Sequence, residues 1–282
     1  MESLATAKVM NNNLKIVPGR KHYDDSRPLD QNYKTKDFPK NDKPIEVIER
    51  VERKYSNIQF DEYGRVIRGY EGMDMKAIYN SKPLSYKFVK RAFDIAASFL
   101  GLVILSPIFL ITAIAIKAED GGPVFFSGQR WGKDFKYFPM LKFRSMCVDA
   151  EARTDEVVGE ADKNGMAFKV KDDPRITKVG KFMRRTTIDE LPQLINVLRG
   201  EMSLVGPRPI QTTKKDGDPY DFQRWCVKPG ITCFWQVDGR AEVPWDEWVE
   251  MDLRYINEMS MWTDIKLLWA TVLAVLGKHG AV

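Results

Sequence analysis

The longest apolar stretch of the chain is an uncharged run of 22 residues, Ile95–Ile116, interrupted near its centre by Ser106-Pro107. A helix of about 20 apolar residues is long enough to cross a bilayer. A proline inside a helix removes a backbone donor and bends the helix, and the Ser106 hydroxyl can satisfy a carbonyl freed by that break. Each half would measure roughly 18 Å at about 1.5 Å per residue, which is enough to enter one leaflet.

The charges that flank this run bear on its topology. Lys87, Lys90 and Arg91 precede the run, and Lys117 follows it. Because basic residues mark the cytoplasmic side of a membrane segment, the pattern favours a re-entrant helix over about residues 92–117 with both ends on that side. A Pro-kinked span and a buried core helix are the alternatives. The run lies too far from the amino terminus for a secretory signal peptide.

The rest of the chain reads as short helices and strands. Residues 1–85 are loop-like, with one short helix predicted around Pro44–Tyr55. The later elements are expected, in chain order, as strands at 124–126 and 135–141 and helices at 176–185, 187–200, 245–256 and 262–276. We therefore expect an α+β, predominantly helical fold, with a weakly structured extension at 1–85 and a catalytic domain at 86–282.

One predicted helix carries two adjacent carboxylates in its first turn. Its apolar stripe, at i, i+3, i+4 and i+7, consists of Leu191, Leu194, Ile195 and Leu198. Gly200 should end this helix. Thr187-x-x-Glu190 fits a capping box, and Asp189 suits a helix amino terminus, so both carboxylates could be caps and nothing more. Capping does not explain the cations placed near them in the sequence, Arg184, Arg185 and Arg208.

Other cations have a distinctive placement in the sequence. Lys142 and Arg144 are two residues apart and share a face if the chain is extended, although an ordinary solvated strand has the same pattern. Arg208 lies between Pro207 and Pro209, which restrict the backbone on both sides of it. An immobilised guanidinium is suited to bidentate phosphate recognition.

Composition excludes several classes of site. The formal net charge is +5; residues 1–90 hold 18 Lys and Arg against 13 Asp and Glu, and the remaining residues hold 26 of each. A basic segment beside a membrane element is attracted to anionic lipid, and no nucleic-acid-binding module is recognisable. Three cysteines and two histidines give no usual zinc spacing. Neither a Walker A loop nor a GxGxxG fingerprint is present.

Taken in order, these motifs resemble the bacterial sugar transferase family, the polyprenyl-phosphate phosphoglycosyl transferases of monotopic type. The resemblance covers about residues 86–282. Its motifs are Lys90-Arg91-x-Phe93-Asp94, Ser106-Pro107, Gly121-Gly122-Pro123-Val124-Phe125-Phe126, Lys142-Phe143-Arg144-Ser145-Met146, Asp189-Glu190-Leu191-Pro192-Gln193, Pro207-Arg208-Pro209 and Lys228-Pro229-Gly230-Ile231-Thr232. Cys233, directly after the last of these motifs, stands where many relatives have Gly.

The resemblance implies a function. A hexose-1-phosphate, with glucose or galactose as the expected sugar, would pass from a UDP-sugar to undecaprenyl phosphate with release of UMP, as the first membrane step of polysaccharide synthesis. Asp189 would be the nucleophile of a covalent intermediate and would join Glu190 in holding Mg²⁺. The expected phosphate-binding residues are Lys142, Arg144, Arg184 and Arg208.

The same resemblance implies a location and partners. The enzyme would lie in the bacterial inner membrane, with its active site on the cytoplasmic face, in contact with membrane lipid and with no nucleic acid partner. A homodimer is left open. Two other functions also remain open: a glycosyltransferase that releases UDP, and a membrane-anchored scaffold of a polysaccharide assembly complex.

Overall fold

The computed structural model describes residues 66–154, 173–210, 218–238 and 244–277. The predicted helix at Pro44–Tyr55 and most of the predicted extension lie outside these residues. The first described helix, α1 (Met75–Ser81), begins at Asp74, whose carboxylate accepts hydrogen bonds from the backbone N–H groups of Lys76 and Ala77 at 2.9 and 3.1 Å. Met75 is fully buried in the main core. The folded part therefore includes residues that precede position 86.

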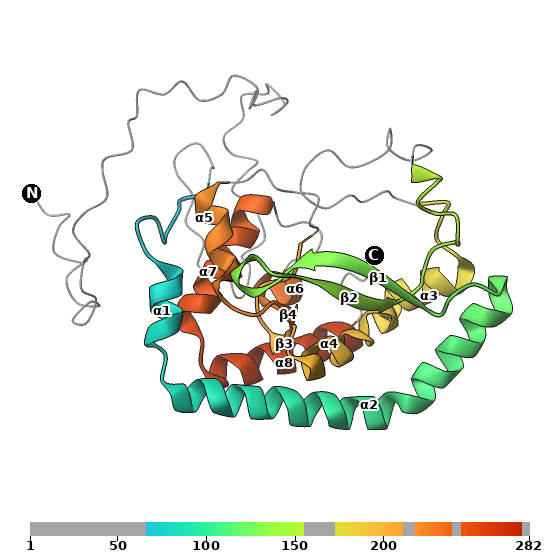
Figure 1. Ribbon diagram of the computed structural model, residues 1–282, viewed down its shortest axis with the longest axis horizontal. Coiled ribbons are helices and arrows are strands. Elements are labelled where there is room, and N and C mark those ends of the chain that lie inside the picture. Colours follow the sequence, from blue (N-terminus) through green and yellow to red (C-terminus); the bar gives the residue numbers. More distant parts are fainter. Residues whose placement is uncertain (1–65, 155–172, 211–217, 239–243, 278–282) are drawn as a thin grey trace, which may run out of the picture. The chain divides into compact units, whose positions relative to one another are not determined.

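The apolar run lies within one helix of 37 residues, α2 (Leu84–Asp120), with Pro107 inside it. Pro107 cannot donate to the carbonyl of Val103, four residues earlier. The Ser106 hydroxyl donates to that carbonyl instead, at 2.8 Å, as the sequence predicted. Figure 1 shows that α2 bends along its course, as a proline within a helix requires. The expected break is therefore a bend within a continuous helix.

The burial of α2 is the reverse of that of a core helix. Its buried residues are Asp94, Ser98, Thr112 and Ile116, whereas most of its apolar side chains are exposed. Only 11% of its most apolar stretch is buried, and by length and composition the helix could cross a membrane. An apolar surface of this extent is unusual on a monomeric soluble protein. The alternative of a buried core helix is therefore wrong.

Two small sheets follow α2. Strands β1 (Phe125–Trp131) and β2 (Tyr137–Phe143) form an antiparallel hairpin, in which Phe126 lies opposite Lys142 and Arg130 opposite Phe138; the short helix η2 (Lys133–Phe135) joins the strands. Strands β3 (Ser203–Val205) and β4 (Gly230–Thr232) are parallel. Both predicted strands are confirmed; β1 is longer than predicted, and β2 begins and ends two residues later than predicted.

The remaining described elements are helical, so the fold is α+β and predominantly helical, as predicted. They are α3 (Lys178–Thr186), η5 (Ile188–Glu190), α4 (Gln193–Arg199), α5 (Pro219–Phe222), η6 (Gln223–Cys226), α6 (Phe234–Asp238), α7 (Trp245–Glu258) and α8 (Met261–Leu276). The main core takes its largest share of buried residues from α7, with further residues from α1, β2, β3 and α6 and one from α8; it contains Met202, Val205, Leu253, Ile256 and Leu267.

Helix α2 packs mainly against α4 (Figure 1), and near its two ends it is hydrogen-bonded to β3 and to α3. Near its start, Lys90 donates to the carbonyl of Val205 at 3.2 Å, and the Asp94 carboxylate accepts from the backbone N–H of Leu204 at 3.1 Å. Near its end, Glu119 accepts hydrogen bonds from the first N–H groups of α3. The helix therefore contacts the strand that leads to Arg208 and the helix that leads to Asp189.

Two local predictions are wrong. The Thr187 side chain does not form the predicted capping box: Thr187 ends α3 with a φ of 58°, and its hydroxyl donates to the carbonyl of Thr186. The helix begins only at Gln193, so the carboxylates lie in the separate 3₁₀ turn η5. The buried face of α4 is also not the predicted stripe, because its buried residues are Gln193, Asn196 and Val197. Gly200 ends α4 as predicted, with φ 86°.

Candidate active site

Asp189 and Glu190 lie in η5, directly after α3. Thr187 adopts the left-handed conformation between the two elements and turns the chain. A 3₁₀ helix has about three residues per turn, so neighbouring side chains leave the axis in different directions. The two carboxylates can therefore occupy different surroundings although they are adjacent in sequence.

Glu190 is held by two cations and an amide. Lys142 Nζ donates to Oε1 at 2.8 Å, and Arg208 binds both oxygens, with Nη2–Oε1 at 2.6 Å and Nη1–Oε2 at 3.1 Å. Gln193 Nε2 donates to Oε2 at 3.0 Å. Burial alone would raise the pKa of Glu190, but the charges and hydrogen bonds of Arg208 and Lys142 outweigh it and hold the pKa well below its ordinary value.

Asp189 has the opposite environment. Its residue is 8% exposed, and no described residue donates a hydrogen bond to its carboxylate. Burial raises its pKa, and neighbouring Glu190 adds to this effect; Lys142, Arg184 and Arg208 offset it only in part. Asp189 is therefore a desolvated carboxylate with charges around it and free oxygens.

The loop after β3 positions Arg208. Gly206 allows this loop to approach the segment before β4, because a Cβ at Gly206 would lie 2.5 Å from the carbonyl oxygen of Lys228. Buried Arg224 donates from Nη2 to the carbonyl of Arg208 at 2.7 Å. The Arg208 guanidinium also lies 5.8 Å from the centre of the Trp235 ring. These contacts agree with the predicted immobilisation of Arg208.

Helix α3 divides its two arginines between the site and solvent. Arg184 donates from Nε to the Ser145 hydroxyl at 2.9 Å. Burial lowers its pKa, and the nearby charges of Asp189 and Glu190 act against that effect. Arg185 is exposed and lies over the Phe182 ring. The structure therefore brings Arg184, but not Arg185, to the carboxylates.

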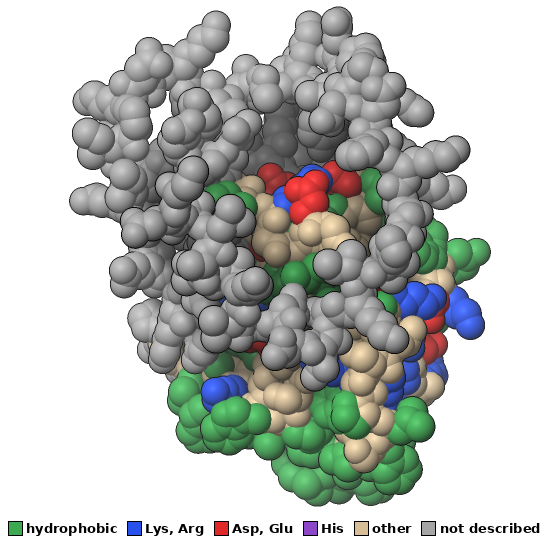
Figure 2. Space-filling model, turned by 90° about the vertical axis from the view of Figure 1, so that its left-hand side faces the viewer, with side chains coloured by type: hydrophobic (Ala, Val, Ile, Leu, Met, Phe, Trp, Pro, Cys, Tyr) green, Lys and Arg blue, Asp and Glu red, His purple; other side chains and the backbone are tan. Residues whose placement is uncertain are grey.

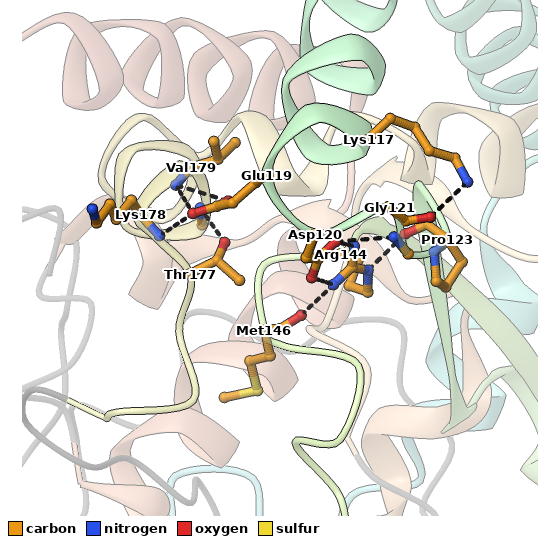
Figure 3. Close-up of polar contacts among 12 residues, drawn as sticks. Lys117, Glu119, Asp120, Gly121, Pro123, Arg144, Met146, Thr177, Lys178 and Val179 are labelled. Carbon is orange, nitrogen blue, oxygen red and sulfur yellow. Dashed lines mark hydrogen bonds and ion pairs between the residues drawn. The ribbon is translucent and has the colours of Figure 1, made fainter.

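Arg144 makes a different set of contacts, at the end of α2 (Figure 3). Its guanidinium forms an ion pair with Asp120 and donates to the carbonyls of Pro123 at 2.6 Å and Met146 at 2.9 Å. Strand β2 ends at Phe143, so the alternation that would align Arg144 with Lys142 does not continue. The structure does not bring Arg144 to Glu190; Arg144 instead attaches the end of α2 to β2.

Two further residues belong to the site. Arg130 on β1 is close enough for the charges of Arg208 and Glu190 to affect its pKa, which burial lowers. In the hairpin register Arg130 shares a face with Lys142, so the two-residue period of the strand could have identified it. Gln193, which contacts Glu190, follows it by one helical turn in the Asp189–Gln193 motif.

The donor set agrees with Mg²⁺ but is not a metal cage. The described residues contain no group of three or more His, Cys, Asp or Glu side chains placed to hold a metal. Mg²⁺ is usually held by one or two carboxylates together with substrate phosphates and water. Asp189 has free oxygens for this purpose, whereas Glu190 would have to give up one of its present hydrogen bonds in order to bind the ion.

Comparison with known proteins identifies the family. The sequence model of the bacterial sugar transferases matches residues 85–278. The galactosyl transferase CpsE of Streptococcus agalactiae is 43% identical over 79% of this chain and 51% of its own length. The undecaprenyl-phosphate galactose phosphotransferase of Salmonella typhimurium is 41% identical over 76% and 46% of the two chains.

A third relative has a different sugar in its name. The UDP-glucose:undecaprenyl-phosphate glucose-1-phosphate transferase of Escherichia coli is 42% identical over 71% of this chain and 43% of its own length. The chain thus spans about half the length of these curated relatives. The extent of the family match leaves no ambiguity: this chain belongs to the bacterial sugar transferase family.

Proposed function

We propose that this chain transfers a hexose-1-phosphate from a UDP-sugar to undecaprenyl phosphate, releases UMP and so begins the membrane stage of polysaccharide synthesis. The observation that carries the proposal is the unequal pair Asp189 and Glu190: cations hold Glu190, while Asp189 is desolvated and accepts no hydrogen bond from the described residues. The names of two relatives include undecaprenyl phosphate together with galactose or glucose. Glucose and galactose are therefore the first donors to test.

The proposed chemistry has two displacements. An Asp189 oxygen attacks the sugar-bearing phosphorus, the bond to the bridging oxygen breaks, and UMP leaves. An oxygen of undecaprenyl phosphate then attacks the same phosphorus and expels the Asp189 carboxylate. A carboxylate nucleophile divides one difficult displacement into two easier ones, and a desolvated carboxylate without hydrogen-bond donors is suited to this role.

Lys142, Arg184 and Arg208 would stabilise the negative charge of the phosphates during transfer. Arg130 would add a fourth cation on the same side of the hairpin. Mg²⁺, when bound by Asp189 and Glu190, would supply Lewis-acid stabilisation of phosphate charge. Before a substrate binds, Lys142 and Arg208 are positioned through Glu190, so the substrate encounters cations that are already placed.

We further propose that α2 enters one leaflet of the bacterial inner membrane and returns, so that the site lies at the cytoplasmic headgroups. The bend at Pro107 and the Ser106–Val103 hydrogen bond support this topology. Single cysteines placed before Arg91 and after Lys117 should both react with an impermeant label from the same side of sealed vesicles. Labelling from opposite sides would mean that the helix spans the membrane.

The reaction is tested by nucleotide release from a panel of UDP-sugars with Mg²⁺, with and without undecaprenyl phosphate. We expect UMP with one sugar, turnover only with the lipid phosphate, and loss of both in Asp189→Asn. Without acceptor, intact-mass analysis should find hexose phosphate on the wild type and none on Asp189→Asn. Exposed Asp246→Asn is the matched control.

The two competing functions predict different results in the same experiment. A glycosyltransferase that keeps both phosphates on the nucleotide would release UDP and carry no covalent adduct. A scaffold would release no nucleotide from any donor, and Asp189→Asn would leave its function intact. Activity that persists in Asp189→Asn would contradict the covalent mechanism.

A further inference from the structure

Two motifs of the sequence that the transfer chemistry does not use meet at the end of α4. Arg91 comes from the start of α2, and Lys228 from the segment before β4. A Cβ built at Gly200, the residue that ends α4, would lie 3.4 Å from both Arg91 Nη2 and Lys228 Nζ. A guanidinium and an ammonium from distant parts of the chain are therefore neighbours.

Lys228 makes no ion pair within the part of the chain that the structure describes. It is half-buried, and its ammonium group forms no hydrogen bond with a described residue. Burial and then the charge of Arg91 lower its pKa; Asp94 acts in the opposite direction and Lys133 adds to the lowering. Arg91 itself donates to the carbonyls of Val197 at 2.6 Å and Leu198 at 2.9 Å, and it forms no ion pair with a described residue.

Two more cations continue this group. Lys133 Nζ and Lys87 Nζ lie 4.4 and 4.7 Å from the centre of the same Tyr79 ring. Neither forms an ion pair with a described residue. We call Lys87, Arg91, Lys133 and Lys228 the α2 cation cluster. Its members come from α2, η2 and the segment before β4, and their mutual repulsion would be relieved by a bound anion.

The surroundings of the cluster indicate where such an anion would come from. On the same turns of α2, Leu84 is 80% exposed and Phe88 is 75% exposed. Figure 2 shows apolar side chains gathered along the lower edge of this face, with Lys and Arg side chains above them. A ligand whose phosphate reaches the cations would therefore carry an apolar part beside α2, as a phospholipid does.

We propose that the α2 cation cluster binds the phosphate of an anionic membrane phospholipid, at a site separate from Asp189 and Glu190. This proposal does not depend on the proposed transfer reaction. It assigns a ligand-binding role to Lys228 and Arg91 in addition to the contacts that Arg91 makes with the end of α4. The phospholipid would bridge α2 and the catalytic part of the fold.

The test uses the full chain in detergent, with native mass spectrometry to count bound lipid. Phosphatidylglycerol, phosphatidylcholine and inorganic phosphate are the three probes. We expect retention of phosphatidylglycerol over phosphatidylcholine. Since one cation near a membrane surface contributes about fivefold to binding of an anionic lipid, Lys228→Gln should weaken retention about fivefold and Lys228→Gln with Lys133→Gln about 25-fold.

Control variants separate binding from folding. Lys228→Arg keeps the charge and should retain the lipid, and exposed Lys181→Gln on α3 should behave as wild type. Circular dichroism checks that each variant is folded, and Lys133→Gln alone, in the hairpin turn, serves if Lys228→Gln does not fold. Equal retention of both lipids by the wild type, or unchanged preference in the folded variants, would overturn the proposal. Displacement of phosphatidylglycerol by an equal concentration of inorganic phosphate would overturn the assignment to a lipid.

Discussion

Arg208 binds Glu190 through both terminal guanidinium nitrogens, at 2.6 and 3.1 Å, while the adjacent Asp189 accepts no hydrogen bond from the residues that the structure describes. The two carboxylates are neighbours in sequence, but their pKa values shift in opposite directions. Such a separation usually accompanies a division of chemical roles. The following predictions test that division and the contacts that maintain it.

The paired geometry of Arg208 should matter more than its charge. Arg208→Lys keeps the cation but cannot bind two oxygens in parallel, so we expect kcat/KM for UMP release to fall by about a hundredfold, or roughly 3 kcal/mol. Exposed Arg199→Lys is the matched control. Similar small changes in both variants would show that the two-nitrogen contact is not needed.

The first displacement should fail in acid, because Asp189 must be ionised to attack. Its pKa is raised above the ordinary 3.8, so activity is present above the raised pKa and is lost as the pH falls through it. Lys142→Met removes a charge that lowers this pKa and should shift the acid limb to higher pH. The measurement is the pH dependence of the UMP burst without acceptor. Exposed Lys181→Met is the control and should leave the acid limb where it is. An unmoved acid limb in Lys142→Met would contradict the assignment.

Asp189 should also reduce the stability of the fold. When folding raises the pKa of a carboxylate, the free energy of unfolding falls as the pH rises from the unfolded to the folded pKa. In that range the folded state keeps the proton, whereas the unfolded state has already released it. Asp189→Asn should therefore raise the midpoint of thermal unfolding at neutral pH while abolishing transfer. The gain should disappear below the unfolded pKa of about 3.8. Exposed Asp246→Asn should change neither quantity.

The buried ion pair between Lys90 and Asp264 should be a strong attachment of α2. The side chains are 12% and 2% exposed, and their charged atoms are 2.8 Å apart. Lys90→Met leaves the Asp264 carboxylate buried without its cation and should lower the free energy of unfolding by about 3 kcal/mol. Adding Asp264→Asn should recover most of that loss in thermal unfolding in detergent. Additive effects of the two substitutions would argue against a direct pair.

Helix α3 packs closely on the segment that follows β2, so any side chain at Gly180 should destabilise the fold. A Cβ at Gly180 would lie 2.0 Å from the backbone oxygen of Ser145, and Ser145 also binds Arg184. Gly180→Ala should reduce stability by about 2 kcal/mol and should also reduce activity, because α3 leads to Asp189. Gly101→Ala on α2, where the nearest contact is 3.4 Å, is the control and should be tolerated.

Local rules predicted part of this structure correctly. A proline leaves the carbonyl four residues earlier without a donor, and Ser106 binds that carbonyl, of Val103. The Ser106 contact is local and could be predicted from adjacent residues. The two prolines around Arg208 indicated only a restricted backbone, and its guanidinium is held by Glu190 and Trp235, which are distant in the sequence.

Other features depend on partners that are distant in sequence. Asn196 is buried because its side chain binds the backbone of β2, at Leu141 N and Pro139 O; the predicted leucine stripe of α4 is left half-buried, with Leu194 against α2. Arg144 is drawn to Asp120 for the same reason. The spacing of residues within α4 or β2 does not reveal where the other element lies. These contacts therefore could not be predicted from the sequence pattern.

The double attachment of α2 has a mechanical consequence. Near its start the helix binds Leu204 and Val205, just before Arg208, and near its end it binds the first turn of α3, just before Asp189. The bend at Pro107 lies between these two attachments. A change in the curvature of α2 at Pro107 should therefore shift the segment that carries Asp189 relative to the segment that carries Arg208.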